Sequence, residues 1–396
     1  MLTGLYFIRT RLIFGIILIT FAFVDERQCL FINNSSNFFS LAQKYGYKPV
    51  KYEVTTDDGY MLSLFRIPGN GTPILFLHGL EDSSDSWILR GKGSLGIKLT
   101  SKGYDCWFAN FRGNRYSRKH VTINPDQERF WDFSFEEFGI YDIPALIDTI
   151  LNSTHASKVN VIAHSQGTTS MFVLLSSREE YNDKVNLVIN LAPMCFMENI
   201  PPPVLSMAQY TNEINDIFKN FSVNEVLGFY SAESKALRSL CALPLFGYRL
   251  CLIGILSTIG GNDAAEIESD FFRYHINNHF PAGTSTKSFA HYGQILQHKS
   301  FQRYDYGDLE NMNKYASSKP PEYDLGKIRT KTALLVAQND NFSRISDVER
   351  LKKQLVNMVN YTILPRKQMN HYDFLWGANT KDYLDPTVFE VLRQFG

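Results

Sequence analysis

The sequence lacks an excess of charge of either sign. Lys plus Arg and Asp plus Glu both number 40 in a chain of 396 residues, so the formal net charge is zero. A protein that binds nucleic acid needs basic side chains to neutralise phosphates, and an acidic tail is typical of a disordered or solvating segment. The composition favours neither class, and we expect no nucleic-acid partner.

The sequence also lacks a grouping of cysteine and histidine that is typical of a metal site. Zinc ligands recur at short, regular spacings, whereas the later histidines are spaced irregularly, at His275, His279, His291 and His298. We therefore predict no bound metal. The five cysteines leave an odd thiol after pairing. Cys106 lies in an apolar run and is predicted to be a buried free thiol, and Cys195 follows another strand-like run.

An apolar run near the N-terminus is too short for a typical membrane span. Arg9 and Arg11 precede the apolar residues 12–24, and Asp25 ends the run. A positive flank before a short apolar run is typical of a secretory signal peptide, here with cleavage expected after Ala22, and an uncleaved anchor is the alternative. The sequence therefore predicts a protein of the secretory pathway, extracellular or lysosomal, without a membrane span in its mature form.

Sequons for N-glycosylation are compatible with this route. The candidates for modification are Asn34, Asn70, Asn152, Asn220 and Asn360. A further sequon at Asn341 adjoins a candidate site residue, which argues against a glycan there.

Most of the chain alternates strand-like and helical patterns. Strand-like runs lie at residues 74–77, 105–109, 159–163, 185–192, 332–337 and 361–364, and helical patterns at residues 138–151 and 168–177. This alternation predicts an α/β fold with a mostly parallel sheet that is covered on both faces.

The alternation fails in one long segment. Residues 196–321 contain three consecutive prolines, helical patterns and the very apolar residues 240–259. One large core with an inserted element suits a chain of this length. We therefore expect a signal peptide at residues 1–22, an α/β core in residues 23–195 and 322–396, and an insertion at residues 196–321.

One serine follows a strand-like run where small residues gather. Residues 159–170 read VNVIAHSQGTTS, with Ser165 at the centre. A serine hydroxyl is a poor nucleophile until a base removes its proton, so it must be held on a tight strand-to-helix turn that an imidazole can reach. The pattern predicts that Ser165 is such a nucleophile, although the pentapeptide alone also occurs by chance.

Two later strand-like runs lead to residues that would complete this chemistry. Residues 332–337 lead to Asp340, and residues 361–364 lead to His371. The chain order Ser, Asp, His is that of the α/β-hydrolases, in which strand ends supply all three groups. We predict that His371 is the general base and then the general acid, and that Asp340 orients it. Taken singly, a turn aspartate and a surface histidine remain alternatives.

An oxyanion hole is expected beside the serine. His78-Gly79-Leu80 follows the strand-like residues 74–77, where this fold offers a backbone N–H to a developing negative charge. We assign the two donors to the amides of Leu80 and Gln166. His78 and His164 are predicted to be structural, because the base is expected on a late loop.

Several motifs outside the serine segment resemble the acid lipases of the gastric, lingual and lysosomal type, from about Tyr45 to nearly the C-terminus. The resemblance rests on residues 52–60, 66–68, 78–80, 82–87, 112–120, 130–135, 141–145, 281–285, 339–340 and 370–376. It implies an α/β-hydrolase fold and a helical cap with a lid over the active site. The related lipases carry a local disulfide at a similar spacing to Cys241 and Cys251, and we predict that bridge.

The chain departs from the family pattern at three places. Ala163 stands where the family usually has glycine, and Glu81 replaces a usual apolar residue. Glu81 is expected to put a charge at the mouth of the site. The residue before His78 is Leu77 rather than the common glutamine, a change without an interpretation.

The motifs and the resemblance together predict a serine lipase. The expected substrates are triacylglycerols, with cholesteryl esters left open, bound at a lipid–water interface and hydrolysed through an acyl-enzyme without a cofactor. An esterase or thioesterase for smaller acyl groups is one alternative, and a non-catalytic lipid-binding derivative is the other. The sequence does not indicate an oligomeric state.

Overall fold

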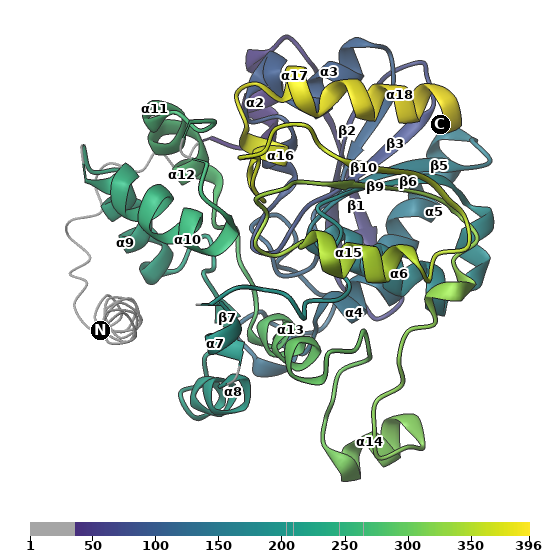
Figure 1. Ribbon diagram of the computed structural model, residues 1–396, viewed down its shortest axis with the longest axis vertical. Helices are drawn as coiled ribbons and strands as arrows, with labels where there is room; N and C mark the ends of the chain where they lie inside the picture. The colour runs from purple at the N-terminus through teal and green to yellow at the C-terminus, as the bar shows by residue number, and fades with distance from the viewer. Residues whose placement is uncertain (1–35, 203, 209, 245, 264) are drawn as a thin grey trace.

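The computed structural model describes residues 36–396 except 203, 209, 245 and 264 (Figure 1). The predicted signal peptide, its cleavage site at Ala22 and the sequon at Asn34 lie outside the described residues. No helix in the described part of the chain is long and apolar enough to cross a membrane.

A central sheet of eight strands organises the molecule, in the order β1-β2-β4-β3-β5-β6-β9-β10. From β4 to β10 all neighbouring strands are parallel, while β1 and β2 pair antiparallel and β2 joins β4 antiparallel. The strands are β1 (Val50–Thr55), β2 (Met61–Ile67), β3 (Pro73–Leu77), β4 (Asp105–Phe108), β5 (Val159–His164), β6 (Val185–Leu191), β9 (Lys331–Val336) and β10 (Met358–Ile363). The predicted α/β fold with a mostly parallel sheet is confirmed.

Both faces of the sheet are buried, which explains the nearly continuous apolar character of its central strands. Alternate residues of a strand point to opposite faces, so Leu75 and Leu77 of β3 enter one core cluster and Ile74 and Phe76 enter the other. Figure 1 shows α3, α17 and α18 on one side of the sheet, and α5, α6 and α15 on the other.

The helices of this core are short to medium in length. They are α2 (Phe38–Lys44), α3 (Leu95–Ser101), α4 (Phe135–Glu137), α5 (Ile143–Thr154), α6 (Gln166–Ser177), α15 (Ile345–Lys352), α16 (Asp373–Trp376), α17 (Thr380–Tyr383) and α18 (Asp385–Phe395). A π-helical turn, Phe138–Asp142, joins α4 to α5, so the helical pattern expected at residues 138–151 is part of a longer helical segment.

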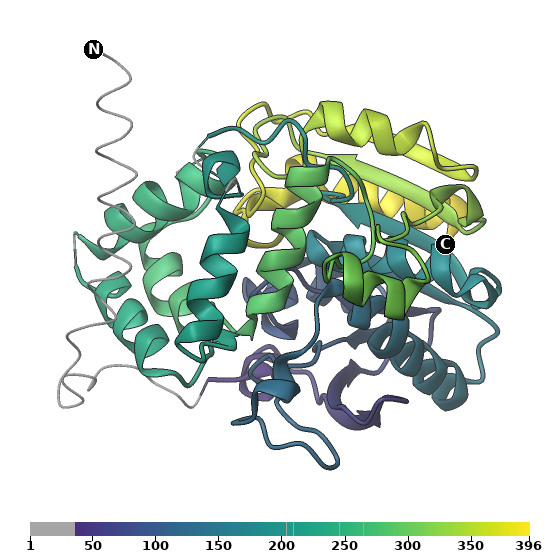
Figure 2. The same cartoon turned by 90° about the horizontal axis from the view of Figure 1, so that it is seen from below.

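The segment between β6 and β9 is helical. It contains α7 (Val204–Ala208), α8 (Thr211–Asn220), α9 (Ala232–Cys241), α10 (Ser257–Gly260), α11 (Ser269–Phe271), α12 (Asn277–His279), α13 (Thr286–His298) and α14 (Asp308–Tyr315), with π-helical turns at Arg249–Leu256 and Phe272–Ile276. Two-residue strands β7 (Glu225–Val226) and β8 (Thr284–Ser285) form a separate antiparallel pair that the sequence did not indicate. Figures 1 and 2 show that α9 to α12 lie beside the sheet rather than over its two helix-covered faces.

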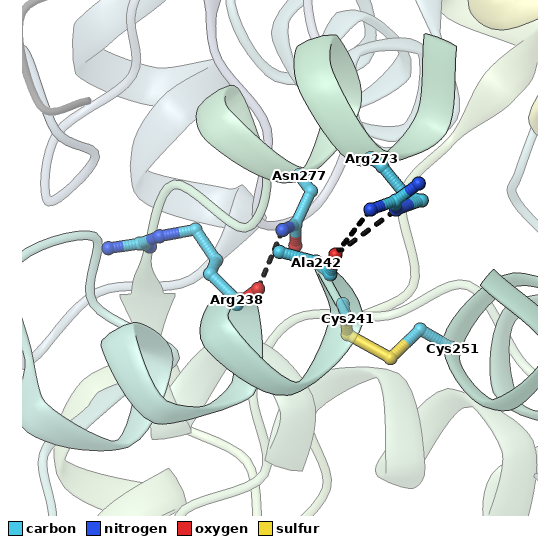
Figure 3. Close-up of a disulfide and its surroundings, with 6 residues drawn as sticks. All are labelled: Arg238, Cys241, Ala242, Cys251, Arg273 and Asn277. Carbon is cyan, nitrogen blue, oxygen red and sulfur yellow. Dashed lines mark hydrogen bonds between the residues drawn. A yellow bond between two sulfur atoms is a disulfide. The ribbon is translucent and has the colours of Figure 1, made fainter. Parts of the chain in front are cut away.

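A disulfide joins Cys241 at the end of α9 to Cys251 in the following π-helical turn (Figure 3). Side chains from the next helical turns also hold the end of α9. Arg273 donates two hydrogen bonds to the carbonyl of Ala242, at 3.1 and 3.0 Å, and Asn277 donates one to the carbonyl of Arg238, at 2.7 Å. The disulfide therefore ties the end of α9 covalently to the π-helical turn that follows it.

Candidate active site

The predicted site residues all follow the carboxyl ends of parallel strands. Ser165 follows β5, Asp340 follows β9 and His371 follows β10, while Leu80 follows β3. Parallel strands end at one common edge of a sheet, and this edge is where open α/β sheets bind ligands. Residues more than 200 positions apart in the chain therefore meet there.

Ser165 occupies a strained turn between β5 and α6. Its backbone has φ +52° and ψ −120°, an unusual conformation for a residue with a side chain. The turn needs a close approach of strand and helix, and a Cβ added at Gly167 would lie 2.7 Å from the carbonyl oxygen of Leu77. Glycine is therefore required at position 167, whereas the methyl group of Ala163 is accommodated in the buried core.

His371 lies between the serine and the aspartate. Its Nε2 is 2.8 Å from Ser165 Oγ, and its Nδ1 is 2.8 Å from Asp340 Oδ2. All three side chains are buried, with exposures of 5% for the serine, 5% for the histidine and 1% for the aspartate. A proton on Nδ1 donates to the carboxylate and leaves the Nε2 lone pair facing the serine hydroxyl.

The second carboxylate oxygen of Asp340 is fixed by the main chain. Oδ1 accepts hydrogen bonds from the amides of Phe342 and Ser343, at 2.8 and 2.9 Å. The carboxylate can therefore rotate little, and the ring of His371 is oriented through it. The ring of Phe342 also packs against the imidazole, with ring centroids 5.0 Å apart, and covers one side of it with apolar carbon.

Two further histidines lie at the site and support its loops. His78 donates from Nδ1 to the carbonyl of Gly79 at 2.8 Å and accepts from the amide of Phe111 at Nε2. His164 donates from Nε2 to the carbonyl of His371 at 3.0 Å. Burial lowers the pKa of His78 to about 4 and the pKa of His164 well below the usual range, so both rings are neutral.

The backbone of the oxyanion loop passes beside the serine. A Cβ added at Gly79 would lie 3.2 Å from Ser165 Cβ, so the following peptide, whose N–H belongs to Leu80, lies close to Ser165. Gln166 is the first residue of α6, and the first N–H groups of a helix have no partner within it. These two amides are therefore positioned as candidate oxyanion donors.

Glu81 follows Leu80 with a left-handed backbone, φ +58°, and its carbonyl accepts from the amide of Ala282 at 2.6 Å. Its side chain is partly buried, and desolvation raises the pKa of the carboxyl to about 8. Desolvation therefore disfavours the charge that the sequence led us to expect at this position.

The helical segment between β6 and β9 contacts the loops that carry His371 and Asp340. The carbonyl of Gly260, at the end of α10, accepts from the amides of His371 and Asn341, at 3.2 and 3.4 Å. The contact is close, because a Cβ at Gly260 would lie 2.3 Å from the ring of Tyr372. The same segment also contacts the loop after β3, through the hydrogen bond from Ala282 to the carbonyl of Glu81. It therefore reaches both the loop of His371 and the loop of Leu80.

Met194, which was not singled out from the sequence, also lies at the site. Met194 follows β6, and its Sδ lies 3.3 Å from Ser165 Oγ. The rule that applies to Asp340 and His371, that residues just beyond a strand end line the site, could have found it. In the described part of the chain, no group of three or more His, Cys, Asp or Glu residues could hold a metal ion.

Comparisons with known proteins agree with this geometry. A model of the alpha/beta hydrolase fold matches residues 72–378, and a model of the partial alpha/beta-hydrolase lipase region matches residues 38–91. Lipase 1 of Drosophila melanogaster is 36% identical over 354 residues, which cover 89% of this chain and 78% of the relative. The lysosomal acid lipase/cholesteryl ester hydrolase of Homo sapiens is 30% identical over 379 residues, which cover 91% of each.

Solved structures show the same fold at low identity. An esterase from Exiguobacterium antarcticum superposes with a TM-score of 0.51 at 12% identity and covers 87% of this chain and 99% of that one. The family matches and the lipase relatives show that the protein is a carboxylic ester hydrolase. The chain matches these families and relatives over most of its length, and it has the mostly parallel sheet of their fold. It therefore belongs to the acid lipase family of α/β-hydrolases.

Proposed function

We propose that the protein is a serine lipase that hydrolyses neutral lipid esters through an acyl-enzyme formed on Ser165. The observation that carries the proposal is the pair of 2.8 Å contacts that His371 makes with Ser165 and with Asp340. These distances are within the range in which a base can accept the proton of a nucleophile.

In the proposed acylation step, Ser165 Oγ attacks the ester carbonyl carbon while His371 Nε2 accepts its proton. The negative charge on the carbonyl oxygen is stabilised by the amides of Leu80 and Gln166. The imidazolium, stabilised by Asp340, then donates its proton to the leaving alcohol. Water repeats the sequence in deacylation and releases the fatty acid.

The substrate class is proposed from the relatives and from the covering insertion. The relatives carry the names lipase and lysosomal acid lipase/cholesteryl ester hydrolase. Because the serine is only 5% exposed, we propose that part of residues 196–321 moves to admit an acyl chain. An apolar substrate that leaves a droplet or membrane surface suits such a site better than a water-soluble one does.

We also propose that the protein is made in the secretory pathway and acts outside the cell or in a lysosome. A disulfide such as Cys241–Cys251 persists in an oxidising compartment. Three candidate glycosylation sites, Asn70, Asn152 and Asn220, are exposed, whereas Asn360 lies half-buried on β10. Digestion of the secreted protein with an N-glycosidase should therefore remove glycans from Asn70, Asn152 and Asn220 and lower the mass of the peptides that contain them.

Hydrolysis of emulsified triolein, cholesteryl oleate and a short-chain ester tests the function. We expect release of oleate, and its loss by at least about 10³-fold in Ser165→Ala. Ser176→Ala is the matched control, because Ser176 is also a buried serine but lies within α6 and donates only to carbonyls of that helix. Activity that survives Ser165→Ala would contradict the mechanism, and activity on the short ester alone would contradict the substrate class.

A further inference from the structure

Met194 lies against the proposed nucleophile. Its Sδ is 3.3 Å from Ser165 Oγ, close enough for the hydroxyl to donate a hydrogen bond to the sulfur, and its side chain is only 6% exposed. The position follows from topology, because β6 is the neighbour of β5 on the side away from β3. The residues beyond β3 and β6 therefore lie on opposite sides of the serine.

The main chain of Met194 is held at both polar groups by α6. Its N–H donates to Thr168 Oγ1 at 2.9 Å, and its carbonyl accepts from Thr169 Oγ1 at 2.9 Å. Thr168 Oγ1 in turn donates to the carbonyl of Ser165 at 2.6 Å. The helix that begins beside the nucleophile therefore also sets the position of Met194.

The residues before Met194 are fixed in the same way. Ala192 has a left-handed backbone, φ +51°, and its N–H donates to the carbonyl of Leu335 at 3.1 Å. The carbonyl of Pro193 accepts from Ser343 Oγ at 2.8 Å. With the backbone fixed from 192 to 194, only the side chain of Met194 is able to adapt to a substrate.

The surroundings of Ser165 leave one side for the acyl chain. The candidate oxyanion donors lie on the β3 side, at Leu80, and at the start of α6. The leaving alcohol must lie near His371 Nε2, because that nitrogen protonates it. The β6 side, occupied by Met194, remains for the acyl group.

We propose that Met194 forms the wall of the acyl-binding side and selects against acyl groups that are branched at the carbon next to the carbonyl. The proposal rests on Ser165 being the nucleophile. An acyl carbon bonded to Oγ must lie beside a thioether that already touches that oxygen. Methionine has three rotatable side-chain bonds and can yield to a linear chain. A methyl branch at the carbon next to the carbonyl would compete with the Met194 thioether for the space beside Oγ.

Soluble p-nitrophenyl esters with straight and branched acyl groups test this selection in the full-length protein. The measured quantity is kcat/KM for 2-methylbutyrate divided by kcat/KM for butyrate. Met194→Ala should raise this ratio about 10-fold, since one methyl group in an apolar site changes specificity by about that amount or more. Met194→Leu should lower it, because its rigid γ-branch lies near Oγ and cannot swing aside.

Met197→Ala is the matched control, because Met197 is a buried methionine three residues further along the same segment. It should leave the ratio unchanged within twofold. A ratio that stays constant in both Met194 variants, or that changes equally in Met197→Ala, would overturn the proposal. The two Met194 variants act in opposite directions, so either one is sufficient if the other does not fold.

Covalent labelling separates this inference from the proposed function. Each variant is treated with a p-nitrophenyl alkylphosphonate, and the modified peptide is identified by mass spectrometry. Label on Ser165 together with an unchanged ratio overturns the role of Met194 alone. Hydrolysis without label on Ser165 overturns the proposed nucleophile and the inference that rests on it.

Discussion

Replacement of Glu81 by glutamine should change how the stability of the protein depends on pH. Glu81 is partly buried beside the candidate oxyanion donor Leu80, and desolvation raises the pKa of its carboxyl from an ordinary value of 4.5 to about 8. Glutamine has nearly the same size and hydrogen-bonding groups but takes up no proton. The difference between the two proteins therefore isolates one titration.

The sign follows from proton uptake. Between about pH 4.5 and 8 the folded protein keeps a proton on Glu81 that the unfolded chain has released, so the stability of the wild type falls as the pH rises through this window. The slope is about 1.4 kcal/mol per pH unit for one proton. From pH 5.5 to pH 7.5 the wild type should lose about 2.5 kcal/mol relative to Glu81→Gln. Above about pH 8 the loss should level off.

Chemical unfolding in urea at half-unit steps from pH 5 to pH 9 measures this difference. Glu128→Gln is the control, because Glu128 is exposed in the structure. Parallel stability curves for wild type and Glu81→Gln between pH 5 and 8 would refute the reasoning. Activity gives a second measurement: ionised Glu81 lies next to an oxyanion donor, so the wild type should lose activity above about pH 8 more steeply than Glu81→Gln does.

Three further predictions concern the site and the insertion. Asp340→Asn should lower kcat about 10³- to 10⁴-fold with the fold intact, because the wrong tautomer of His371 is then favoured. Measurements of kcat and circular dichroism test this, and activity that stays within tenfold of the wild type would contradict it. Gly167→Ala should lower activity at least about tenfold, because its Cβ would lie 2.7 Å from the carbonyl of Leu77, and a fully active, normally stable variant would show that the turn can yield. Replacing Cys241 and Cys251 by serine should destabilise the insertion by about 3 kcal/mol, because the unfolded chain regains the entropy that a cross-link between residues 10 positions apart removes. Calorimetry measures this loss, and an unchanged unfolding transition would contradict the prediction.

The core of the fold could be predicted because its strands are buried on both faces. The runs at 74–77, 159–163 and 332–337 are continuous apolar stretches bounded by turn residues, and each lies within or beside a strand of the structure, β3, β5 and β9. The antiparallel strands β1 and β2 were not predicted. Residues of β1, at the edge of the sheet, are mostly exposed and only Val54 is buried, so this strand carries a weaker apolar pattern.

The helical insertion shows the opposite case. The failure of alternation at residues 196–321 indicated a separate element, but the sequence did not indicate how its very apolar residues 240–259 would be placed. In the structure this stretch bends through a π-helical turn that the disulfide closes, and its far end contacts the loop of His371. Such a contact depends on the arrangement of several helices, and local periodicity contains no information on it.

Sequence alone determined which residues could supply the chemistry: a serine in a tight turn, an acid and a base after later strands, and small residues where backbones must approach. Tertiary structure alone decided that His371 lies 2.8 Å from Ser165, that Met194 touches the same hydroxyl, and that desolvation raises the pKa of Glu81. The physical reason is that apolar patterns and turn preferences are local properties of the chain. Distances across the sheet and the desolvation of a carboxyl depend on atoms from many segments, which only the folded protein brings together.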